Sequence, residues 1–453
     1  MMQPVRLIIK IKNMKSICLS FALIIFLCLI ISGCGQQKKG NADFFSDRPN
    51  IIILFIDDMG YGDLGCYGSE TIRTPRIDKL AEDGARFTDF YVQPVCGPSR
   101  SALLTGRYPF RSGGWGMPGS EVTFAELLKT VGYTTGCIGK WDCSNRKDII
   151  GRVPNDQGFD YYWGPLGAND RGTVYIWDNR DSIGPDTNMA GLTKTYTDKA
   201  LTFLEENKDN PFLLYLAHTM LHVVVDASPE FQGKSKNGLY GDAAEELDFH
   251  TGRLLDKIDE LGLSENTIVI FTSDNGPWSN DQERQRQKNN GALAWGSAGP
   301  LREAKGSTWE GGMRVPCIIR WPGNVQAGRT SHAIFSSVDL LPTLGTLAGY
   351  EVPADRTIDG VDQSDLLLGI SEQGNRDHLY YFSMDNLHGV RQGDWKLLLP
   401  NRKGYRNYVQ DLGTEGIELY NLKDDIGETT NVAGAHPDIV EQLQILADQL
   451  PMD

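Results

Sequence analysis

Four apolar runs, each followed at once by polar residues, constrain the fold of this chain more than any other feature. The first run covers residues 50–56 and ends at Asp57-Asp58. Because it has no polar alternation, it is typical of a strand buried on both faces of a parallel sheet. The other runs cover residues 133–138, 211–217 and 267–272, and they lead to Gly139-Lys140-Trp141-Asp142, to His218 and His222, and to Ser273-Asp274-Asn275-Gly276.

Helical segments separate these strands. One begins with a cap and a first-turn proline at Thr74-Pro75 and stops at Gly84, and another covers residues 240–261 with apolar positions at helical spacing. Strands that alternate with helices predict an α/β domain, here over residues 49–345. In open sheets of this class, ligands bind at the carboxyl ends of the strands. The polar residues at these ends are therefore expected to form one site.

The chain changes character after a helix start at residues 339–343. Beyond it come loops, two short strand candidates at 379–382 and 395–399, and an amphipathic helix at 437–450. This pattern predicts a small α+β domain over residues 346–453, in which an antiparallel sheet packs against one helix.

The first 33 residues are interpreted as an export signal. Four cations among the first 15 residues precede an uncharged apolar run at 17–31, too short for a comfortable membrane-spanning helix. The run ends in Ile31-Ser32-Gly33-Cys34, which resembles a bacterial lipobox. That resemblance implies cleavage before Cys34, lipidation of its thiol, and a lipoprotein of the bacterial cell envelope, in the periplasm or at the outer membrane. A plain signal peptide cut nearby is the alternative, and residues 34–48 are interpreted as a polar tether.

The charge balance excludes one class of partner. The chain has 44 Lys and Arg and 59 Asp and Glu, a net charge of −15. Removal of residues 1–33 leaves 40 cations and 59 acids, a net charge of −19. Because a surface of this sign repels phosphate backbones, no nucleic acid partner is expected.

The eight cysteines do not form a disulfide framework, although export would permit one. The signal and the lipid anchor account for three of them. Cys137 and Cys143 are close enough in sequence to pair, but no bridge is expected. Besides Cys96, the remaining cysteines are Cys66, Cys137, Cys143 and Cys317.

A metal site is predicted from the type of ligand at two strand ends. Asp57, Asp58, Asp274 and Asn275 supply only oxygen atoms, which favours a hard cation such as Ca²⁺ over Zn²⁺, with Mg²⁺ as the alternative. One such pair alone would be better explained as a helix cap. Two pairs at two strand ends favour a metal.

Cys96 is expected just before the N-terminus of a short helix, with Pro98 in the first turn and Gly106 at the end. Unpaired amide protons and the helix dipole make that place favourable for an anion, or for a nucleophile that attacks one. A buried structural cysteine is the alternative interpretation.

The string of residues 96–107, Cys-Gly-Pro-Ser-Arg-Ser-Ala-Leu-Leu-Thr-Gly-Arg, resembles the signature of the formylglycine-dependent sulfatases of the alkaline phosphatase superfamily. The resemblance implies a large domain with a mixed, mostly parallel sheet between helices, a small C-terminal domain, and hydrolysis of sulfate esters. It also implies that a separate maturase oxidises Cys96 to formylglycine. Further matching segments are residues 49–63, 139–141, 158–160, 273–276, 305–316 and 418–422.

The resemblance also implies roles for individual residues. A hydrated formylglycine at position 96 attacks the sulfur of the substrate, and its second hydroxyl then expels sulfate from the enzyme. A thiol or simple alcohol has no such second hydroxyl and would leave a stable sulfate ester on the enzyme. Arg100 steadies this nucleophile, Lys140 and Lys305 bind sulfate oxygens, and His222 acts as an acid or a sulfate ligand. The implied Ca²⁺ ligands are Asp57, Asp58, Asp274, Asn275 and the modified Cys96.

The chain departs from the family at one position of the site. The family usually continues Gly-Lys-Trp with a histidine that helps to deprotonate the nucleophile, whereas this chain has Asp142. We hypothesise that Asp142 replaces that base, which requires Lys140 or the metal to offset its repulsion from sulfate, or a raised pKa. His218 is the other candidate. The segment around His222 also lacks the proline that the family tends to place there.

An exported enzyme meets polymers and oligosaccharides, so a sulfated carbohydrate is the expected substrate, with a small sulfate ester as the simpler case. Four tryptophans in loop-like segments could stack on sugars or belong to the core. They are Trp115, Trp163, Trp278 and Trp295. Two rival functions remain: a phosphoester or phosphonate hydrolase of the same superfamily, and a non-catalytic lipoprotein that binds sulfated glycans.

Overall fold

Strand β1 (Asn50–Ile56) lies at the centre of the main sheet, and every residue in it is buried. The computed structural model describes residues 48–144, 151–278, 295–400, 402 and 413–450. In it, β1 pairs in parallel with β7 (Phe212–Ala217) on one side and with β8 (Thr267–Ser273) on the other. Strand β3 (Thr134–Gly139) pairs in parallel with β7. The four strands predicted from apolar runs are therefore confirmed, as neighbours in one sheet.

Both edges of this sheet contain antiparallel pairs. Strand β9 (Arg314–Arg320) is antiparallel to β8 and to β2 (Ala85–Tyr91). At the other edge, β4 (Tyr161–Pro165) is parallel to β3, and the hairpin of β5 and β6 completes the sheet. The predicted mixed, mostly parallel sheet is thus confirmed for the described residues. The remaining strands are β5 (Val174–Asp178), β6 (Asp181–Asp186), β10 (Arg329–Ser331) and β11 (Phe335–Ser336).

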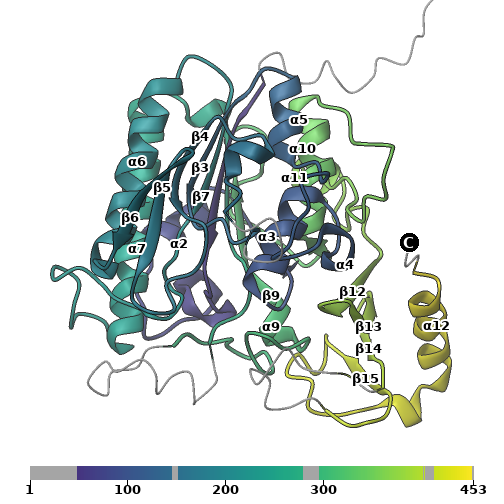
Figure 1. The fold of residues 1–453 in the computed structure, drawn as a ribbon. Coiled ribbons are helices and arrows are strands. Elements are labelled where there is room, and N and C mark those ends of the chain that lie inside the picture. Colours follow the sequence, from purple (N-terminus) through teal and green to yellow (C-terminus); the bar gives the residue numbers. More distant parts are fainter. Residues whose placement is uncertain (1–47, 145–150, 279–294, 401, 403–412, 451–453) are drawn as a thin grey trace, which may run out of the picture. The chain divides into compact units, whose positions relative to one another are not determined.

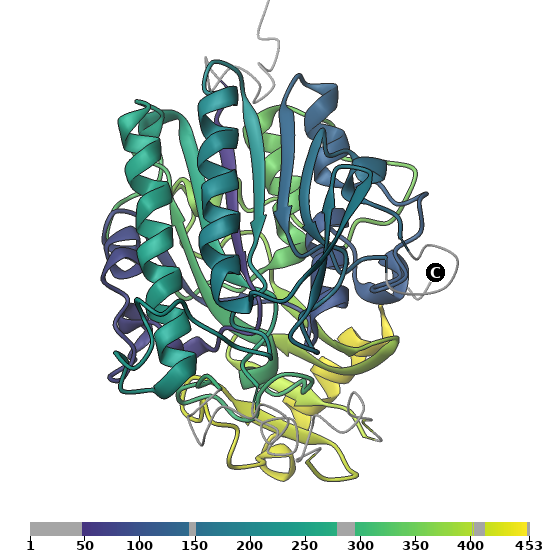
Figure 2. The same cartoon turned by 60° about the vertical axis from the view of Figure 1, so that its left-hand side comes forward.

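Helices cover both faces of the main sheet (Figure 1). On one face, α6 (Leu192–Asn207) and α7 (Gly238–Glu260) pack side by side, as Figure 2 shows, and α2 (Pro75–Glu82) packs against α7. Their apolar residues join those of β1, β7 and β8 in one core. The other face carries α3 (Cys96–Thr105), α4 (Pro109–Ser112), α5 (Phe124–Thr130) and α10 (Leu340–Ala348).

A second sheet follows in the chain, with antiparallel strands in the order β12, β13, β14, β15. Helix α12 (Pro437–Asp448) packs against β13 and β14, which confirms the predicted α+β arrangement. One short helix, α11 (Ser364–Leu367), lies in the segment expected to be loop. The strands are β12 (His378–Ser383), β13 (Asn386–Gln392), β14 (Trp395–Leu398) and β15 (Glu418–Asn421).

A buried ionic cluster connects the second sheet with the main one. Glu310 begins α9 (Glu310–Met313), directly before β9, and its carboxylate lies 2.9 Å from Nζ of Lys396 on β14. The same ammonium group lies 2.7 Å from Glu428, and Arg314 on β9 lies 3.4 Å from Glu310. These buried ion pairs join β14 of the second sheet to the segment that leads into β9 of the main sheet.

The predicted export signal, the lipobox with Cys34 and nearly all of the predicted tether lie outside the described residues. Among the described residues, no helix has the length and apolar character needed to cross a lipid bilayer. The five cysteines in this part of the chain are all free, in agreement with the expectation that Cys137 and Cys143 form no bridge.

Candidate active site

The polar residues at the strand ends converge on one side of the main sheet. Asp57 and Asp58 follow β1, Asp274 and Asn275 follow β8, and Lys140 follows β3. Helix α3 supplies Cys96 and Arg100, the segment after β7 supplies His222, and the loop before α9 supplies Lys305. All nine are at most 5% exposed. The structure thus brings these nine residues together at the carboxyl ends of the strands.

A cluster of acidic side chains lies within this site. Ligand atoms of Asp57, Asp58, Asp274 and Cys96 all lie within 4.8 Å of one another. Asp58 has a positive φ of 61°, and its amide donates to Oδ1 of Asp274 at 3.1 Å. The Asn275 amide nitrogen donates to Oδ1 of Asp58 at 2.6 Å, which leaves Oδ1 of Asn275 without a hydrogen-bond partner. Oδ2 of Asp58 has none either.

Two buried oxygen atoms without hydrogen-bond partners, in a cluster with three carboxylates, fit the predicted hard cation. An unsatisfied buried oxygen is destabilising, and a cation would satisfy both at once. The ligand chemistry is entirely oxygen apart from the sulfur of Cys96, as Ca²⁺ prefers. The residues of the site thus fit a calcium ion.

Three buried cations face the three carboxylates. Lys140 Nζ lies 2.7 Å from Oδ2 of Asp57, Arg100 Nη2 lies 2.7 Å from Oδ2 of Asp274, and Lys305 Nζ lies 2.6 Å from Oδ1 of Asp58. Arg100 also donates to the Lys140 carbonyl at 3.0 Å, which fixes its guanidinium under the site. Since each acid has its own cation, added negative charge is not repelled by a net acidic pocket.

Burial and neighbouring charges shift the pKa values of the acids in opposite directions. Burial raises the pKa of Asp57, but Lys140 and His222 outweigh it, and the pKa lies below its ordinary value. Burial and the charge of Asp57 raise the pKa of Asp274, and Arg100 offsets them only in part. A divalent cation bound here would lower the pKa of Asp274 as well.

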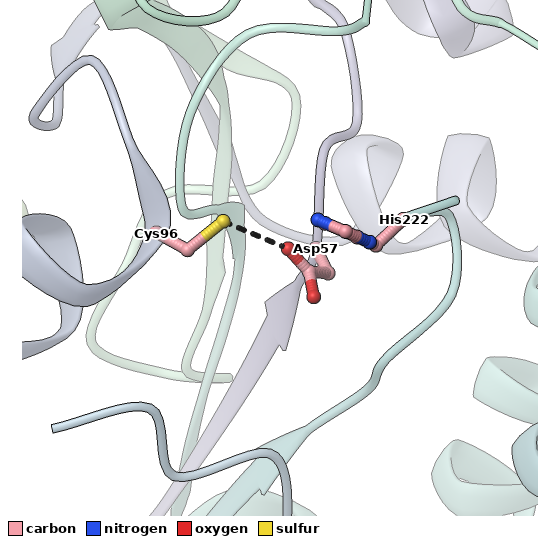
Figure 3. A group of neighbouring side chains, drawn as sticks. All are labelled: Asp57, Cys96 and His222. Carbon is pink, nitrogen blue, oxygen red and sulfur yellow. Dashed lines mark hydrogen bonds between the residues drawn. The ribbon is translucent and has the colours of Figure 1, made fainter. Parts of the chain in front are cut away.

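Cys96 is the first residue of α3 rather than the residue before it, and Val95 is the cap. Its Sγ donates to Oδ1 of Asp57 at 3.4 Å, as Figure 3 shows, and accepts from Lys305 Nζ at 3.1 Å. Burial, then the charges of Asp274 and Asp57, raise the pKa of this thiol well above its ordinary value. Burial therefore disfavours the thiolate of an unmodified Cys96, and a thiol is a poor nucleophile compared with a thiolate.

His222 lies between a buried and an exposed carboxylate. Its Nε2 is 3.7 Å from Oδ2 of Asp58 and 3.7 Å from Oδ1 of Asp170. The ring meets Trp278 edge-on, with centroids 5.6 Å apart. Asp170 was not singled out from the sequence, because its loop has no motif, and only the fold brings it to His222.

Asp142, the residue that departs from the family pattern, reaches the edge of the site. Its Oδ2 accepts from the indole nitrogen of Trp115 at 3.1 Å and lies 3.5 Å from Lys140 Nζ. Burial raises the pKa of Asp142 despite Lys140. The Trp115 ring packs so closely over Gly97 that a Cβ there would lie 2.2 Å from the ring. Trp115 thus contacts both Asp142 and Gly97, the residue that follows Cys96.

His218 points elsewhere. It is buried against Tyr196 of α6, with ring centroids 5.8 Å apart, and burial, with a contribution from His250, lowers its pKa to about 3. Because it packs on the α6 side of the sheet and its low pKa makes it a weak base, His218 does not fit the role of the missing base.

The four tryptophans divide between site and core. Trp115 contacts Gly97, and Trp278 contacts His222 and the ammonium group of Lys305, so both border the site. Trp163 packs against Tyr196 of α6 and belongs to the core. Trp295 is half-buried, and its carbonyl accepts from Asn237.

Comparisons with known proteins agree with this arrangement. Residues 49–350 match the family described as sulfatase, and residues 304–451 match the family described as N-sulphoglucosamine sulphohydrolase, C-terminal.

Similar proteins cover most of the chain. Steryl-sulfatase of Rattus norvegicus is 36% identical, over 74% of this chain and 73% of that protein. N-acetylgalactosamine-6-O-sulfatase of Bacteroides thetaiotaomicron is 32% identical, over 93% of this chain and 96% of that protein. A solved structure described in connection with the metabolism of multiple glycosaminoglycans by Bacteroides thetaiotaomicron is 30% identical, with a TM-score of 0.80 over 89% of this chain and 99% of that chain. The chain belongs to the sulfatase family and is a sulfuric ester hydrolase of the arylsulfatase type.

Proposed function

We propose that this chain hydrolyses the sulfate esters of carbohydrates through a formylglycine made from Cys96, with a calcium ion in the acidic cluster. The observation that carries the proposal is the position of Cys96. Its Sγ lies between Asp57 at 3.4 Å and Lys305 at 3.1 Å, among the ligand atoms of the cluster. The sulfur marks the place that a hydroxyl oxygen of the modified residue would take.

The shifted pKa of Cys96 supports the modification. Burial disfavours ionisation of this thiol and so lowers its nucleophilicity. A sulfate group transferred to it would also have no neighbouring hydroxyl to expel it. The hydrate of formylglycine would supply one hydroxyl to attack sulfur and a second to expel the sulfate. The proposal therefore includes a maturase as a partner.

Asp57, Asp58, Asp274 and Asn275 would hold the calcium ion. When bound, it would supply Lewis acidity to a sulfate oxygen and hold that oxygen against position 96. In this arrangement Arg100 keeps Asp274 in place through its 2.7 Å contact.

The remaining cations bind the sulfate and handle the proton of the leaving group. Lys140 and Lys305 present ammonium groups to the sulfate oxygens, where negative charge grows in the transition state. His222 is placed to protonate the leaving alcohol, since its Nε2 lies on the route from the buried Asp58 to the exposed Asp170. Asp142 accepts the proton of the attacking hydroxyl in place of the histidine that the family usually has at this position.

The carbohydrate substrate is supported by the bacterial relatives. The relative that matches 93% of this chain is named for N-acetylgalactosamine 6-sulfate, and the similar solved structure is described in connection with glycosaminoglycan metabolism. A relative of higher identity is named for steryl sulfates. Comparison of kcat/KM for a sulfated hexosamine with kcat/KM for a steryl sulfate therefore decides between the two substrate classes.

We also propose export and anchoring through a lipid on Cys34. Replacement of Cys34 by serine is expected to release the protein from the membrane fraction without loss of turnover. A protein that remains in the membrane fraction after this change would contradict the anchor.

The proposal is tested by turnover of p-nitrophenyl sulfate with wild-type protein expressed together with a maturase. Cys96→Ala and calcium removal by a chelator should each abolish turnover, and added calcium should restore only the second. Turnover of p-nitrophenyl phosphate faster than that of the sulfate would favour a phosphoester hydrolase. Binding of a sulfated glycan without turnover by matured protein would favour the non-catalytic function.

A further inference from the structure

Asp170 is a solvent-facing carboxylate beside His222. Its side chain is 66% exposed, whereas that of Asp58 is 0% exposed, and both lie 3.7 Å from Nε2 of His222. The line from Asp58 through His222 to Asp170 therefore runs from the buried metal cluster to solvent. Because His222 is the proposed proton donor to the leaving alcohol, that alcohol would lie near Nε2 and therefore close to Asp170.

The loop that carries Asp170 is fixed to the His222 segment. The side-chain nitrogen of Asn169 donates to the carbonyls of His222 at 3.3 Å and Val224 at 2.9 Å. The amide of Val224 donates back to the Asn169 carbonyl at 3.4 Å. Because these bonds join residues adjacent to Asp170 and to His222, the carboxylate keeps its place beside the proton donor.

The charge of Asp170 faces the cations of the site. Burial raises the pKa of Asp170, but His222, Lys140 and Lys305 outweigh it, and the pKa lies below its ordinary value. An ionised carboxylate accepts hydrogen bonds and donates none. It attracts a hydroxyl or amide N–H of a substrate and repels a second anionic group at the same place.

We propose that Asp170 selects sulfate esters that carry a hydroxyl or an amide N–H beside the ester and no second sulfate or carboxylate there. This inference rests on the proposed function and names the substrate class within it: sugar sulfates with a free neighbouring hydroxyl. An anionic group beside the ester is therefore disfavoured by the charge of Asp170.

Three aryl sulfates that differ in the group beside the ester test the proposal: nitrocatechol sulfate with a hydroxyl, p-nitrophenyl sulfate with hydrogen, and salicyl sulfate with a carboxylate. The kcat/KM of the first and third is divided by that of p-nitrophenyl sulfate and compared between wild type and Asp170→Asn. Comparison of each ratio between wild type and variant removes the intrinsic difference in reactivity between the leaving groups. Asp181→Asn is the matched control, because Asp181 is exposed and begins β6 at the opposite end of the β5–β6 hairpin.

In Asp170→Asn, the ratio for nitrocatechol sulfate should fall about fivefold, since a charge-assisted hydrogen bond is lost. The ratio for salicyl sulfate should rise about fivefold, since repulsion between like charges is removed. Unchanged ratios, or the same changes in Asp181→Asn, would overturn the proposal. Wild-type turnover of p-nitrophenyl sulfate is read separately: if matured protein does not hydrolyse it, the proposed function fails, and this inference fails with it.

Discussion

The ammonium group of Lys305 lies 3.1 Å from Sγ of Cys96. The same group lies 2.6 Å from Asp58 and 4.5 Å above the ring centre of Trp278, so three side chains hold it at one point. A fixed cation beside the attacking atom stabilises charge that develops on the sulfate oxygens.

Replacement of Lys305 by methionine is therefore expected to lower kcat/KM for aryl sulfates at least about 100-fold, because one fixed charge donor is lost from the transition state. Lys199→Met is the matched control, since Lys199 also lies over a tryptophan, Trp163, but belongs to the α6 side. Steady-state kinetics of both variants measure the loss of kcat/KM. Equal losses in the two would mean that Lys305 acts only through packing.

Calcium should stabilise the folded protein through Asp57, Asp58 and Asp274. A ligand that binds only the native state adds about 2.7 kcal/mol to the free energy of unfolding at one hundred times its Kd. Denaturant titrations with and without calcium measure this gain. Asp274→Asn should abolish it. Asp63→Asn should keep it, because buried Asp63 accepts from Tyr240 outside the cluster.

Asp142→Asn tests the substitute for the missing histidine. If Asp142 accepts the proton of the nucleophile, the variant loses at least about 100-fold in kcat. The carboxylate must be ionised to act, and burial raises its pKa, so wild-type activity should rise with pH through a value above the ordinary pKa of an aspartate. This rise should be absent from the pH profile of the variant. Near-normal kcat in Asp142→Asn would remove the residue from the mechanism.

Glu310→Gln should weaken the connection between the two sheets. Burial raises the pKa of Glu310, but Lys396 and Arg314 outweigh it and hold the value at about 2, below the ordinary 4.5. The variant is expected to lose about 3 kcal/mol in the free energy of unfolding, because Lys396 and Arg314 each lose one of their buried carboxylate partners.

This loss has a defined pH window. A lowered carboxylate pKa contributes stability above the ordinary value, and that stability disappears as pH falls through the folded value. The difference between wild type and Glu310→Gln should therefore be complete above about pH 4.5 and vanish toward pH 2. Denaturant midpoints across this range provide the measurement. A difference independent of pH would contradict the assigned charge.

The central strands and the residues directly after them were predictable from sequence, because an uninterrupted apolar run such as β1 is a local signal. Strand β2 was not predicted, since its sequence, Ala-Arg-Phe-Thr-Asp-Phe-Tyr, mixes charged and apolar residues near one edge of the sheet. The β5–β6 hairpin at the other edge also has no long apolar run.

The residues of the candidate site also fall into those that were predictable from sequence and those that only the fold brings together. Asp57, Lys140 and Asp274 follow strands, so their convergence could be inferred from topology alone. Asp170 could not, because hydrogen bonds from Asn169 to a segment more than fifty residues away bring it to His222. That contact is tertiary and leaves no local pattern in the sequence.

The chemical state of position 96 is the central claim, and mass spectrometry measures it most directly. Peptides that contain residue 96 are to be compared between protein matured in its native host and protein expressed without a maturase. The account predicts that the matured peptide is lighter than the cysteine form by the mass of H₂S less one oxygen atom, and that turnover follows the modified fraction. An unmodified thiol at position 96 in fully active protein would contradict it.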